Sequence, residues 1–510
     1  MNKRIPLSAA SIVPLLAGSC VGDPAVSVPE NARPNIIFIF SDDLGIGDLS
    51  CYGATRVATP HIDRLAAQGQ RFTNAYAATS TPSRFGLLTG MYPWRLPNTQ
   101  IAPGNSELII DPECHTLADA MHDAGYVTGA VGKWHLGLGP VGGTDFNVEI
   151  RPDARDIGFD YEYLIPATVD RVPCVFVENG RVVGLDPSDP ITVNYDHKVG
   201  DWPTGSENPE LLKLRPSHGH DNTIVNGISR IGWMTGGRSA LWVDEGIADT
   251  IALKATQFIA RHKDEPFFLY MGTNDVHVPR VPHPRFAGKS GLGTRGDVIL
   301  QLDWTIGEVM RTLDSLGIAD NTLLVFTSDN GPAIDDGYQD EAAMRLGGHT
   351  PSGIYRGGKY SLYEAGTRVP FIVRWPSCVK PGEQSAVFSQ IDVYRSLAAL
   401  TGVALPEGAA PDSRNHLPEL LGMGHSDREY VIEQNRQNTL AIRCGEWKYL
   451  EPSDRQSYEY RKSVELGNSP RPQLFCISKD PCERHDVAEQ YPGIVEELAT
   501  KLNTVKSGRK

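Results

Sequence analysis

The segment at residues 35–40, Asn-Ile-Ile-Phe-Ile-Phe, constrains the fold of this chain more than any other feature. Its β-branched and aromatic side chains favour a β-strand, and no charged residue interrupts the apolar run. Such a run is typical of a parallel sheet that is covered on both faces. It ends abruptly at residues 41–45, where Asp42 and Asp43 are adjacent. In open α/β sheets this carboxyl end of the strands is where ligands bind.

A second apolar segment, residues 322–328, leads in the same way into Asp329 and Asn330. Adjacent carboxylates repel each other unless a cation, a proton or solvent compensates their charge. A lone Asp-Asp pair is usually a solvated loop, but two buried strands that both end in oxygen donors favour a metal site. Hard oxygen donors without a soft ligand suit Ca²⁺, or less readily Mg²⁺, rather than zinc. The predicted ligands are Asp42, Asp43, Asp329 and Asn330.

Between these two segments the chain alternates helical and extended patterns. Helices are predicted at residues 60–69 and 116–125, and further strands at residues 126–131 and 266–271. Strands and helices in series predict an α/β fold with a large, mainly parallel sheet sandwiched by helices. This catalytic α/β domain is expected to span residues 34–405.

The C-terminal part has a different pattern. After a helix expected at residues 387–400 and a linker rich in Pro, Ala and Gly, short strands are separated by turns, which indicates an antiparallel sheet. A final helix is expected near residues 494–502. We therefore predict a smaller C-terminal subdomain over residues 406–510, with strands at residues 430–432, 440–443 and 447–450.

Polar residues follow several of the predicted strands. Lys133 and His135 come after the strand at residues 126–131 and point the same way if the chain is extended. His277 follows the strand at residues 266–271, and Lys359 follows two glycines that let the backbone approach a small anion. A single His or Lys in a loop is more often structural or solvated. Several strand ends that converge on one edge favour a functional site instead.

Residues 80–90, Ser-Thr-Pro-Ser-Arg-Phe-Gly-Leu-Leu-Thr-Gly, combine a turn with a short apolar segment. Pro82 suits the first turn of a helix, so Ser80 is expected at its N-cap, beside free backbone N–H groups that attract anions. For Pro-Ser-Arg alone, an ordinary helix start would be the better interpretation. The whole run, however, resembles the sulfatase pattern, in which a Cys or Ser is followed by x-Pro-Ser-Arg and then by Leu-Thr-Gly.

Further segments carry the same resemblance, closely at residues 132–137 and 356–370 and more loosely at residues 273–279. The chain thus resembles the formylglycine-dependent sulfatases of the alkaline-phosphatase-like superfamily, of the serine type, from Asn35 to the terminal helix. The resemblance implies that a maturation enzyme oxidises Ser80 to formylglycine, the catalytic aldehyde, which is then hydrated. It also implies one calcium ion, held by the four predicted ligands and by an oxygen of the modified Ser80.

Roles for the remaining residues also follow from the resemblance. Lys133 and Lys359 are expected to neutralise the sulfate, and Arg84 to orient the hydrated aldehyde. His277 is expected to protonate the leaving oxygen, while His135 takes a proton from the second hydroxyl and sulfate is expelled. The order of these two histidines could be reversed.

Residues 145–244 interrupt the strand–helix alternation and are rich in Pro, Gly, Asp and His. Long insertions beside a catalytic site are usually binding loops. Asp170 and Arg171 could accept from and donate to one axial sugar hydroxyl, and His218 and His220 could bind others. For each of these groups a plain surface loop is the alternative.

The insertion resembles those of bacterial carbohydrate sulfatases that act on sulfated galactose or N-acetylgalactosamine. We therefore predict exo-acting removal of a 6-O-sulfate from such a sugar in host glycans. Other sulfate positions (3-O or 4-O) and other sugars remain open. So do a phosphodiesterase or phosphonate hydrolase of the same superfamily, and a sulfated-glycan binding protein without catalysis.

The first 20 residues have the form of an export signal, with Lys3 and Arg4 before an apolar stretch and small residues before Cys20. This resembles a lipoprotein signal, so we expect lipidation at Cys20, a tether over residues 21–33 and a periplasmic or cell-surface lipoprotein of a Gram-negative bacterium. A soluble secreted protein is the alternative. The net charge of −14 argues against nucleic acid as a partner and against membrane contact other than this anchor.

Overall fold

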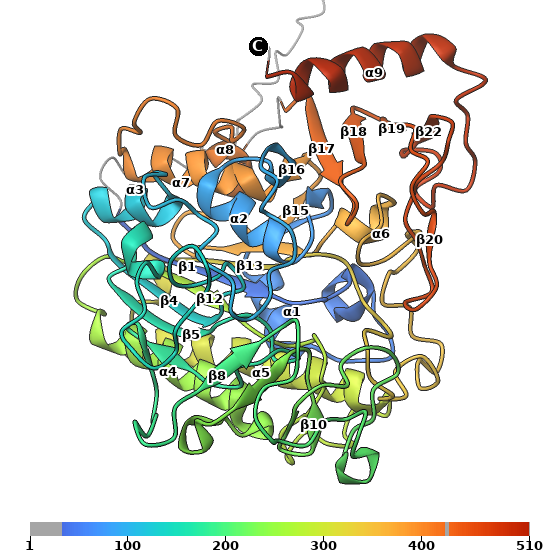
Figure 1. Ribbon diagram of the computed structural model, residues 1–510. Helices are drawn as coiled ribbons and strands as arrows, with labels where there is room; N and C mark the ends of the chain where they lie inside the picture. The colour runs from blue at the N-terminus through green and yellow to red at the C-terminus, as the bar shows by residue number, and fades with distance from the viewer. Residues whose placement is uncertain (1–32, 424–427, 509–510) are drawn as a thin grey trace, which may run out of the picture.

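The computed structural model describes residues 33–423 and 428–508 of the protein. The expected signal peptide and nearly all of the tether lie outside these residues. At the centre is a ten-stranded sheet, and helices cover both of its faces (Figure 1). The strand order is β15-β2-β14-β13-β1-β12-β4-β5-β6-β7.

The middle of this sheet is parallel, as predicted. Strand β1 pairs in parallel with β13 on one side and with β12 on the other, and β12 continues to β4 and β5. The bounds of these strands are β1 Asn35–Ser41, β4 Val127–Lys133, β5 Tyr161–Ile165, β12 Phe267–Gly272 and β13 Thr322–Ser328.

The sheet edges depart from the parallel pattern. Strand β14 is antiparallel to β13 and ends at Arg374, before the residue that precedes Pro376. Strand β5 lies inside the predicted insertion and still belongs to the main sheet. The edge strands are β2 Gln70–Phe72, β6 Val177–Glu178, β7 Arg181–Val182, β14 Phe371–Arg374 and β15 Gly382–Gln384.

Both faces of strand β1 are buried, which explains why its sequence is apolar without interruption. Phe38 and Phe40 pack into a core with helices α2, α3 and α7, whereas Ile37 and Ile39 face the opposite core with α1, α4 and α5. Figure 1 shows α2, α3 and α7 above the sheet and α4 and α5 below it. The helices span α1 Pro60–Ala67, α2 Thr81–Thr89, α3 Leu117–Asp123, α4 Ile247–Arg261, α5 Gly293–Leu316 and α7 Val393–Thr401.

The helix expected at residues 387–400 begins later than predicted. Phe388 and Ser389 form strand β16, which pairs with β3 (Ala75–Tyr76), and Ser389 and Asp392 form a capping box before α7. Backbone pairing with a distant strand therefore overrides the local helical pattern. Two short helices, α6 Glu364–Thr367 and α8 Leu417–Leu420, lie on either side of this region in the sequence.

Apart from β5, β6 and β7, the insertion consists of loops, short 3-10 helices and two small strand pairs. In these pairs β8 lies against β11, and β9 against β10. Their bounds are β8 Thr192–Asn194, β9 Ile224–Val225, β10 Ile228–Ser229 and β11 Trp233–Thr235.

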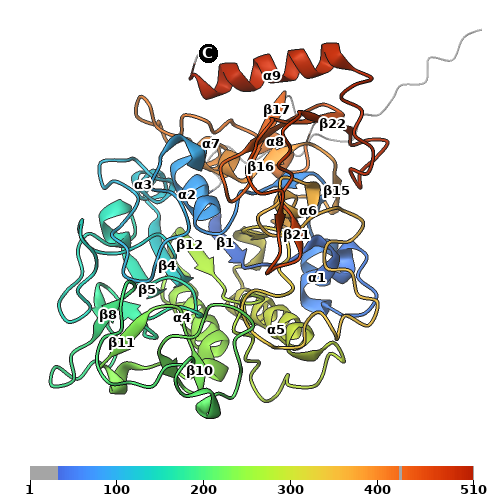
Figure 2. The same cartoon turned by 45° about the vertical axis from the view of Figure 1, so that its right-hand side comes forward.

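The C-terminal part contains the predicted antiparallel sheet, in the order β17-β18-β19-β22, with helix α9 across it (Figure 2). Leu498 and Leu502 of α9 pack on Ile432, Ile442 and Leu474 of this sheet. A hairpin, β20–β21, extends away from the sheet (Figure 2). The bounds are β17 Tyr430–Gln434, β18 Leu440–Cys444, β19 Trp447–Leu450, β20 Tyr458–Glu459, β21 Val464–Glu465, β22 Gln473–Cys476 and α9 Pro492–Lys506.

Two further observations apply to the described residues alone. Their seven cysteines, including Cys476 and Cys482, are all free thiols. None of their helices combines the length and the apolar character needed to cross a bilayer.

Candidate active site

Strands β1 and β13 bring the four predicted metal ligands together. Their register pairs Ser41 with Ser328, so the residues that follow each strand lie side by side. Asn330 Nδ2 donates to Asp43 Oδ1 at 2.8 Å, and the Asp43 amide donates to Asp329 Oδ1 at 3.3 Å. All four side chains are completely buried.

Two lysines compensate the buried carboxylates. Lys133, at the end of β4, forms an ion pair with Asp42 and lies 3.7 Å from Asp329. Lys359 Nζ lies 2.8 Å from Asp43 Oδ1 and 2.9 Å from Asp336 Oδ2. Burial, together with the charge of Asp329, raises the pKa of Asp42 to about 8. Burial alone would also raise the pKa of Asp43, but Lys359 and His277 outweigh it and lower that pKa.

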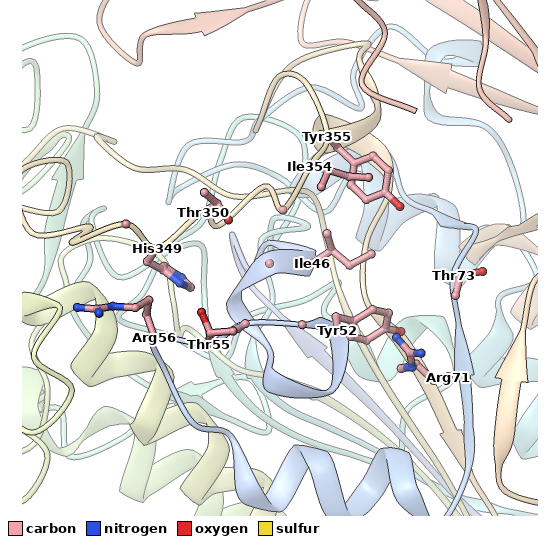
Figure 3. Close-up of a pocket in the computed structure, with 15 residues that line it drawn as sticks. Ile46, Tyr52, Thr55, Arg56, Arg71, Thr73, His349, Thr350, Ile354 and Tyr355 are labelled. Atoms are coloured by element: carbon pink, nitrogen blue, oxygen red, sulfur yellow. The ribbon is translucent and has the colours of Figure 1, made fainter. Parts of the chain in front are cut away.

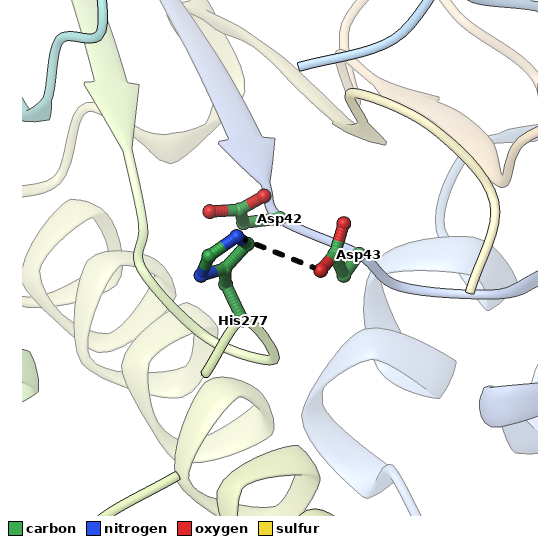
Figure 4. A group of neighbouring side chains, drawn as sticks. All are labelled: Asp42, Asp43 and His277. Carbon is green, nitrogen blue, oxygen red and sulfur yellow. Dashed lines mark ion pairs between the residues drawn. The ribbon is translucent and has the colours of Figure 1, made fainter. Parts of the chain in front are cut away.

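The residues at this site fit a divalent cation. Asp42 Oδ1 is buried and has no hydrogen-bond partner, which is costly unless an ion or water binds it. Side-chain ligand atoms of Asp42, Asp43 and His277 all lie within 4.8 Å of one another (Figure 4). The imidazole of His277 was not among the predicted ligands. Because calcium prefers oxygen donors, His277 is better suited to handling a proton beside the ion.

Ser80 occupies the N-cap of α2, but its hydroxyl does not cap the helix. Its backbone has φ 46° and ψ −118°, a region that residues other than glycine rarely adopt. The hydroxyl instead lies 3.2 Å from Nδ1 of His135, and the Ser80 amide donates to Asn330 Oδ1 at 2.9 Å. The hydroxyl of Ser83, and not that of Ser80, accepts a hydrogen bond from the Ala78 amide and donates one to the Asp329 carbonyl. The strained turn therefore directs the Ser80 side chain away from the helix.

The two predicted histidines lie on different sides of the site. His135 Nε2 donates to the Ala102 carbonyl at 3.1 Å, which leaves Nδ1 as an acceptor facing Ser80. His277 Nδ1 donates to the Val278 carbonyl at 2.7 Å, and its Nε2 lies 3.8 Å from both Asp43 and Asp336. Burial lowers the pKa of both rings well below the ordinary value; the charge of Lys133 adds to this at His135, and that of Lys359 at His277.

Arg84 is completely buried and holds a carboxylate of the predicted metal site. Its guanidinium donates to Asp329 Oδ2 at 3.0 Å and to the Tyr270 hydroxyl at 2.7 Å, and it lies over the Phe40 ring at 4.9 Å. The side chain was expected to orient the group at position 80. Its contacts show that it also orients Asp329.

A pocket of about 920 Å³ opens over these groups. Ser80, His135, His277 and Lys359 line its floor side, and all four predicted sugar-binding residues, Asp170, Arg171, His218 and His220, also line it.

The residues predicted to bind the sugar form one connected group. His220 Nε2 lies 2.9 Å from Asp170 Oδ2, and Arg171 donates to Asp170 Oδ1 at 2.9 Å. The Arg171 charge and the hydrogen bond from His220 overcome burial and lower the pKa of Asp170 well below its ordinary value. Asp170 is therefore an ionised acceptor at the pocket wall. His218 lies farther out, with Nδ1 at 3.0 Å from the Ser217 hydroxyl and 3.9 Å from Asp335.

Several pocket residues were not predicted from the sequence. Asp336 binds Lys359 and also forms an ion pair with Lys462, which comes from the turn of the β20–β21 hairpin. Tyr360, Arg436 and Gln100 line the pocket as well. No local pattern marks Lys462 as functional, since its neighbours resemble an ordinary charged turn. Asp336 had a weak signal, because it follows Asn330 by only six residues in a Gly- and Asp-rich loop.

Known proteins that are similar in sequence along most of this chain are sulfatases. The N-acetylgalactosamine-6-O-sulfatase of Bacteroides thetaiotaomicron is 72% identical over 477 residues, which cover 93% of each chain. Arylsulfatase A of Homo sapiens is 31% identical over 492 residues, which cover 93% of this chain and 87% of that protein. A solved structure from work on the metabolism of multiple glycosaminoglycans by Bacteroides thetaiotaomicron has a TM-score of 0.93 at 72% identity and covers 93% of this chain and 100% of the other.

A phosphonate monoester hydrolase of Agrobacterium radiobacter, 18% identical with a TM-score of 0.58 over 94% of this chain and 96% of its own, shares the fold alone. The family model described as Sulfatase matches residues 34–403. Because this family model and sulfatases of 72% and 31% identity match most of the chain, the chain belongs to the sulfatase family and is a sulfuric ester hydrolase.

Proposed function

We propose that this protein removes the 6-O-sulfate from N-acetylgalactosamine or galactose at the non-reducing end of a glycan. The observation that carries this proposal is the single pocket in which Asp170, Arg171 and His220 face Ser80 and Lys359. The 72% identity to an N-acetylgalactosamine-6-O-sulfatase supports the same substrate class. The pocket volume suits a monosaccharide with part of the next sugar.

The nucleophile is proposed to arise from Ser80 by oxidation to formylglycine, which requires a separate maturation enzyme. Three observations support this proposal. The Ser80 hydroxyl does not cap helix α2, and the backbone at Ser80 is strained. The hydroxyl also lies beside His135, and Ser80 lines the pocket. An unmodified serine would be a weak nucleophile here, because its neighbour His135 lacks a carboxylate partner on its other nitrogen, which faces the Ala102 carbonyl. The hydrated aldehyde would supply the attacking oxygen.

One calcium ion is proposed at the four oxygen-bearing residues Asp42, Asp43, Asp329 and Asn330, beside Ser80. Their hard donors, their complete burial and the unpartnered Asp42 Oδ1 support this assignment. When bound, the ion would supply positive charge next to the sulfate and acidify a coordinated hydroxyl.

Two lysines and two histidines are proposed to supply the positive charge and the proton transfers. Lys133 and Lys359 offset the negative charge of the sulfate, which would otherwise repel a nucleophile. His277 Nε2 lies 3.8 Å from Asp43 and from Asp336, and the charge of Asp43 opposes the lowering of the His277 pKa by burial and Lys359. A proton held at this Nε2 would be the one donated to the leaving sugar oxygen. Nδ1 of His135 accepts the proton from the side-chain oxygen at position 80.

Recognition of the sugar is assigned to the group around Asp170. The ionised Asp170 accepts a hydrogen bond from an axial hydroxyl, and Arg171 donates to the same oxygen. His220 holds Asp170 from the opposite side. An equatorial hydroxyl would leave this buried acid and base without their partner, which costs about 1–3 kcal/mol.

The deciding experiment is turnover by natively matured protein of four monosaccharides: 6-O-sulfated N-acetylgalactosamine, galactose and N-acetylglucosamine, and 4-O-sulfated N-acetylgalactosamine. The first two should be hydrolysed and the other two should not. Preference for the glucosamine or the 4-O-sulfated sugar would refute the substrate assignment. Mass spectrometry of the peptide that contains Ser80 should show the loss of two hydrogens; an unmodified serine in active protein would refute the nucleophile.

Export as a lipoprotein remains our inference from the first 20 residues, and it is supported by the small residues that precede Cys20. Metabolic labelling with a fatty acid tests it. Incorporation that disappears in a Cys20→Ala variant is expected, and secretion of unlabelled protein would refute the anchor.

A further inference from the structure

A second cavity, shown in Figure 3, lies beside the segment that follows the aspartates of the proposed metal site. Its volume is about 520 Å³, within the range of small-molecule binding sites. Within the part of the chain that the structure describes, it shares no lining residue with the catalytic pocket.

The charged groups in this cavity are all basic, although the whole chain carries a net charge of −14. The side chain of Arg56 has no hydrogen bond or ion pair within residues 33–423 and 428–508, and it is exposed. Arg71 is held at the opposite end, where it pairs with Glu383 and lies 4.9 Å from the centre of the Tyr52 ring. Figure 3 shows the two arginines on either side of Tyr52. This arrangement attracts an anion.

A buried histidine provides a second, independent observation. His349 lines the cavity and is only 5% exposed. Its Nε2 lies 2.7 Å from Asp48 Oδ1, and Asp48 is also clamped by both terminal nitrogens of Arg295. Because a carboxylate accepts hydrogen bonds, Nε2 carries a proton. Nδ1 has no hydrogen-bond partner in the described part of the chain, so it can accept a hydrogen bond from a molecule in the cavity.

The remaining surface suits a sugar. Hydroxyls of Thr55, Thr73 and Thr350 line the cavity together with the Tyr52 ring, and Ile354 stands 63% exposed at its edge. Hydroxyl groups match the hydroxyls of a saccharide, whereas ring and aliphatic surface covers its C–H face.

We propose that this cavity binds a sulfated saccharide at a site distinct from the catalytic pocket. The sulfate group lies against Arg56 or Arg71, a sugar hydroxyl donates to Nδ1 of His349, and the sugar ring covers Ile354. Such a site would retain a sulfated glycan on the enzyme while the catalytic pocket turns over an end of it. This inference goes beyond the proposed function, and its test does not depend on turnover.

The test measures binding of a 6-O-sulfated chondroitin tetrasaccharide by calorimetry to the full chain carrying Ser80→Ala, which cannot turn it over. Adding Arg56→Ala and Arg71→Ala should remove one bound saccharide per protein. The matched control is Arg471→Ala, an arginine that is 84% exposed and pairs with Glu489. An unchanged stoichiometry in the double-arginine variant would overturn the proposal.

A second pair of variants distinguishes repulsion of the sulfate by a negative charge from a loss of folding. Both replace Ile354, which is exposed and therefore tolerates polar side chains. In the same background, Ile354→Glu should weaken the affected binding event at least tenfold, whereas Ile354→Gln should change it by less than about threefold. Equal effects of the two would overturn the assignment. The unsulfated tetrasaccharide should not compete for the site, and inorganic sulfate that competes as well as the saccharide would refute recognition of the sugar.

Discussion

Lys462, on a hairpin of the C-terminal part, forms an ion pair with Asp336, which also binds Lys359 of the predicted catalytic set. This contact joins the C-terminal hairpin to the catalytic pocket. Burial lowers the pKa of Lys462 to about 8, although Asp43 and Asp170 nearby oppose this shift. Its ammonium form therefore dominates below about pH 8 and is lost above it.

Removal of the Lys462 charge should weaken binding of an anionic substrate. We expect Lys462→Ala to lower kcat/KM about 10- to 100-fold, mostly through KM, since buried hydrogen bonds to charged groups are worth about 1.5–3 kcal/mol. In the wild type kcat/KM should decline above about pH 8, and in Lys462→Arg this decline should move to higher pH because the guanidinium keeps its proton. An unchanged pH profile in Lys462→Arg would contradict the role of Lys462.

Asp170 should matter for galacto-configured sugars and much less for a small aryl sulfate. Asp170→Asn keeps the size of the side chain but removes the charge that Arg171 and His220 contact. We expect kcat/KM on the sulfated sugar to fall about 10- to 100-fold and that on the aryl sulfate by less than about threefold. His218→Ala, whose ring contacts Ser217 and Asp335 and not Asp170, serves as the milder comparison. Equal losses on both substrates would count against a role in sugar recognition.

Ser80→Ala should abolish turnover and leave the fold intact. The Ser80 side chain makes no capping hydrogen bond, so its loss removes only the contact with His135. The melting temperature should change by less than about 4 °C, because the expected cost is about 1 kcal/mol or less. Substantial activity in this variant would overturn the proposed nucleophile.

Calcium affinity should depend on pH. In the metal-free protein Asp42 has its pKa raised to about 8, so below that pH it holds a proton that calcium must displace. The apparent affinity should fall as the pH drops below about 8, by up to about tenfold per pH unit while one proton is released. Titration of calcium-stripped protein at several pH values, followed by its melting temperature, checks this. Asp264→Asn, an exposed carboxylate, should behave as the wild type.

Lys448 should be essential for stability, because it joins the C-terminal sheet to α6 of the catalytic part. Its buried Nζ lies 3.0 Å from Glu364, 2.9 Å from Glu433 and 3.3 Å from Glu483. Lys448→Met leaves these buried carboxylates without their cation and should cost about 3–5 kcal/mol of unfolding free energy. Chemical denaturation measures this cost. Lys501→Met, which removes a partly exposed pair with Glu429, should cost about 1 kcal/mol or less.

The central strands, the oxygen-bearing residues after them and the segment proposed to carry the nucleophile could all be predicted from the sequence. Strands β1 and β13 could be predicted because burial on both faces demands an apolar run, and this demand is visible locally. The likeness of residues 80–90 to the sulfatase pattern then predicted Ser80 as the nucleophile and the sulfatase family, and the comparisons confirm the family. The late start of α7 and the antiparallel direction of β14 could not be predicted, because each depends on pairing with a distant strand.

The residues that complete the pocket could not be predicted, because distant segments of the chain supply them. Asp170 and His220 are 50 residues apart in the sequence and are joined by a hydrogen bond. Lys462, in the β20–β21 hairpin of the C-terminal part, forms an ion pair with Asp336 of the catalytic part. The cavity with Arg56, Arg71 and His349 likewise combines segments that are nearly 300 residues apart. Charged side chains on loops carry no periodicity that marks their partners, so their chemistry depends on which loops the packing of the core brings together.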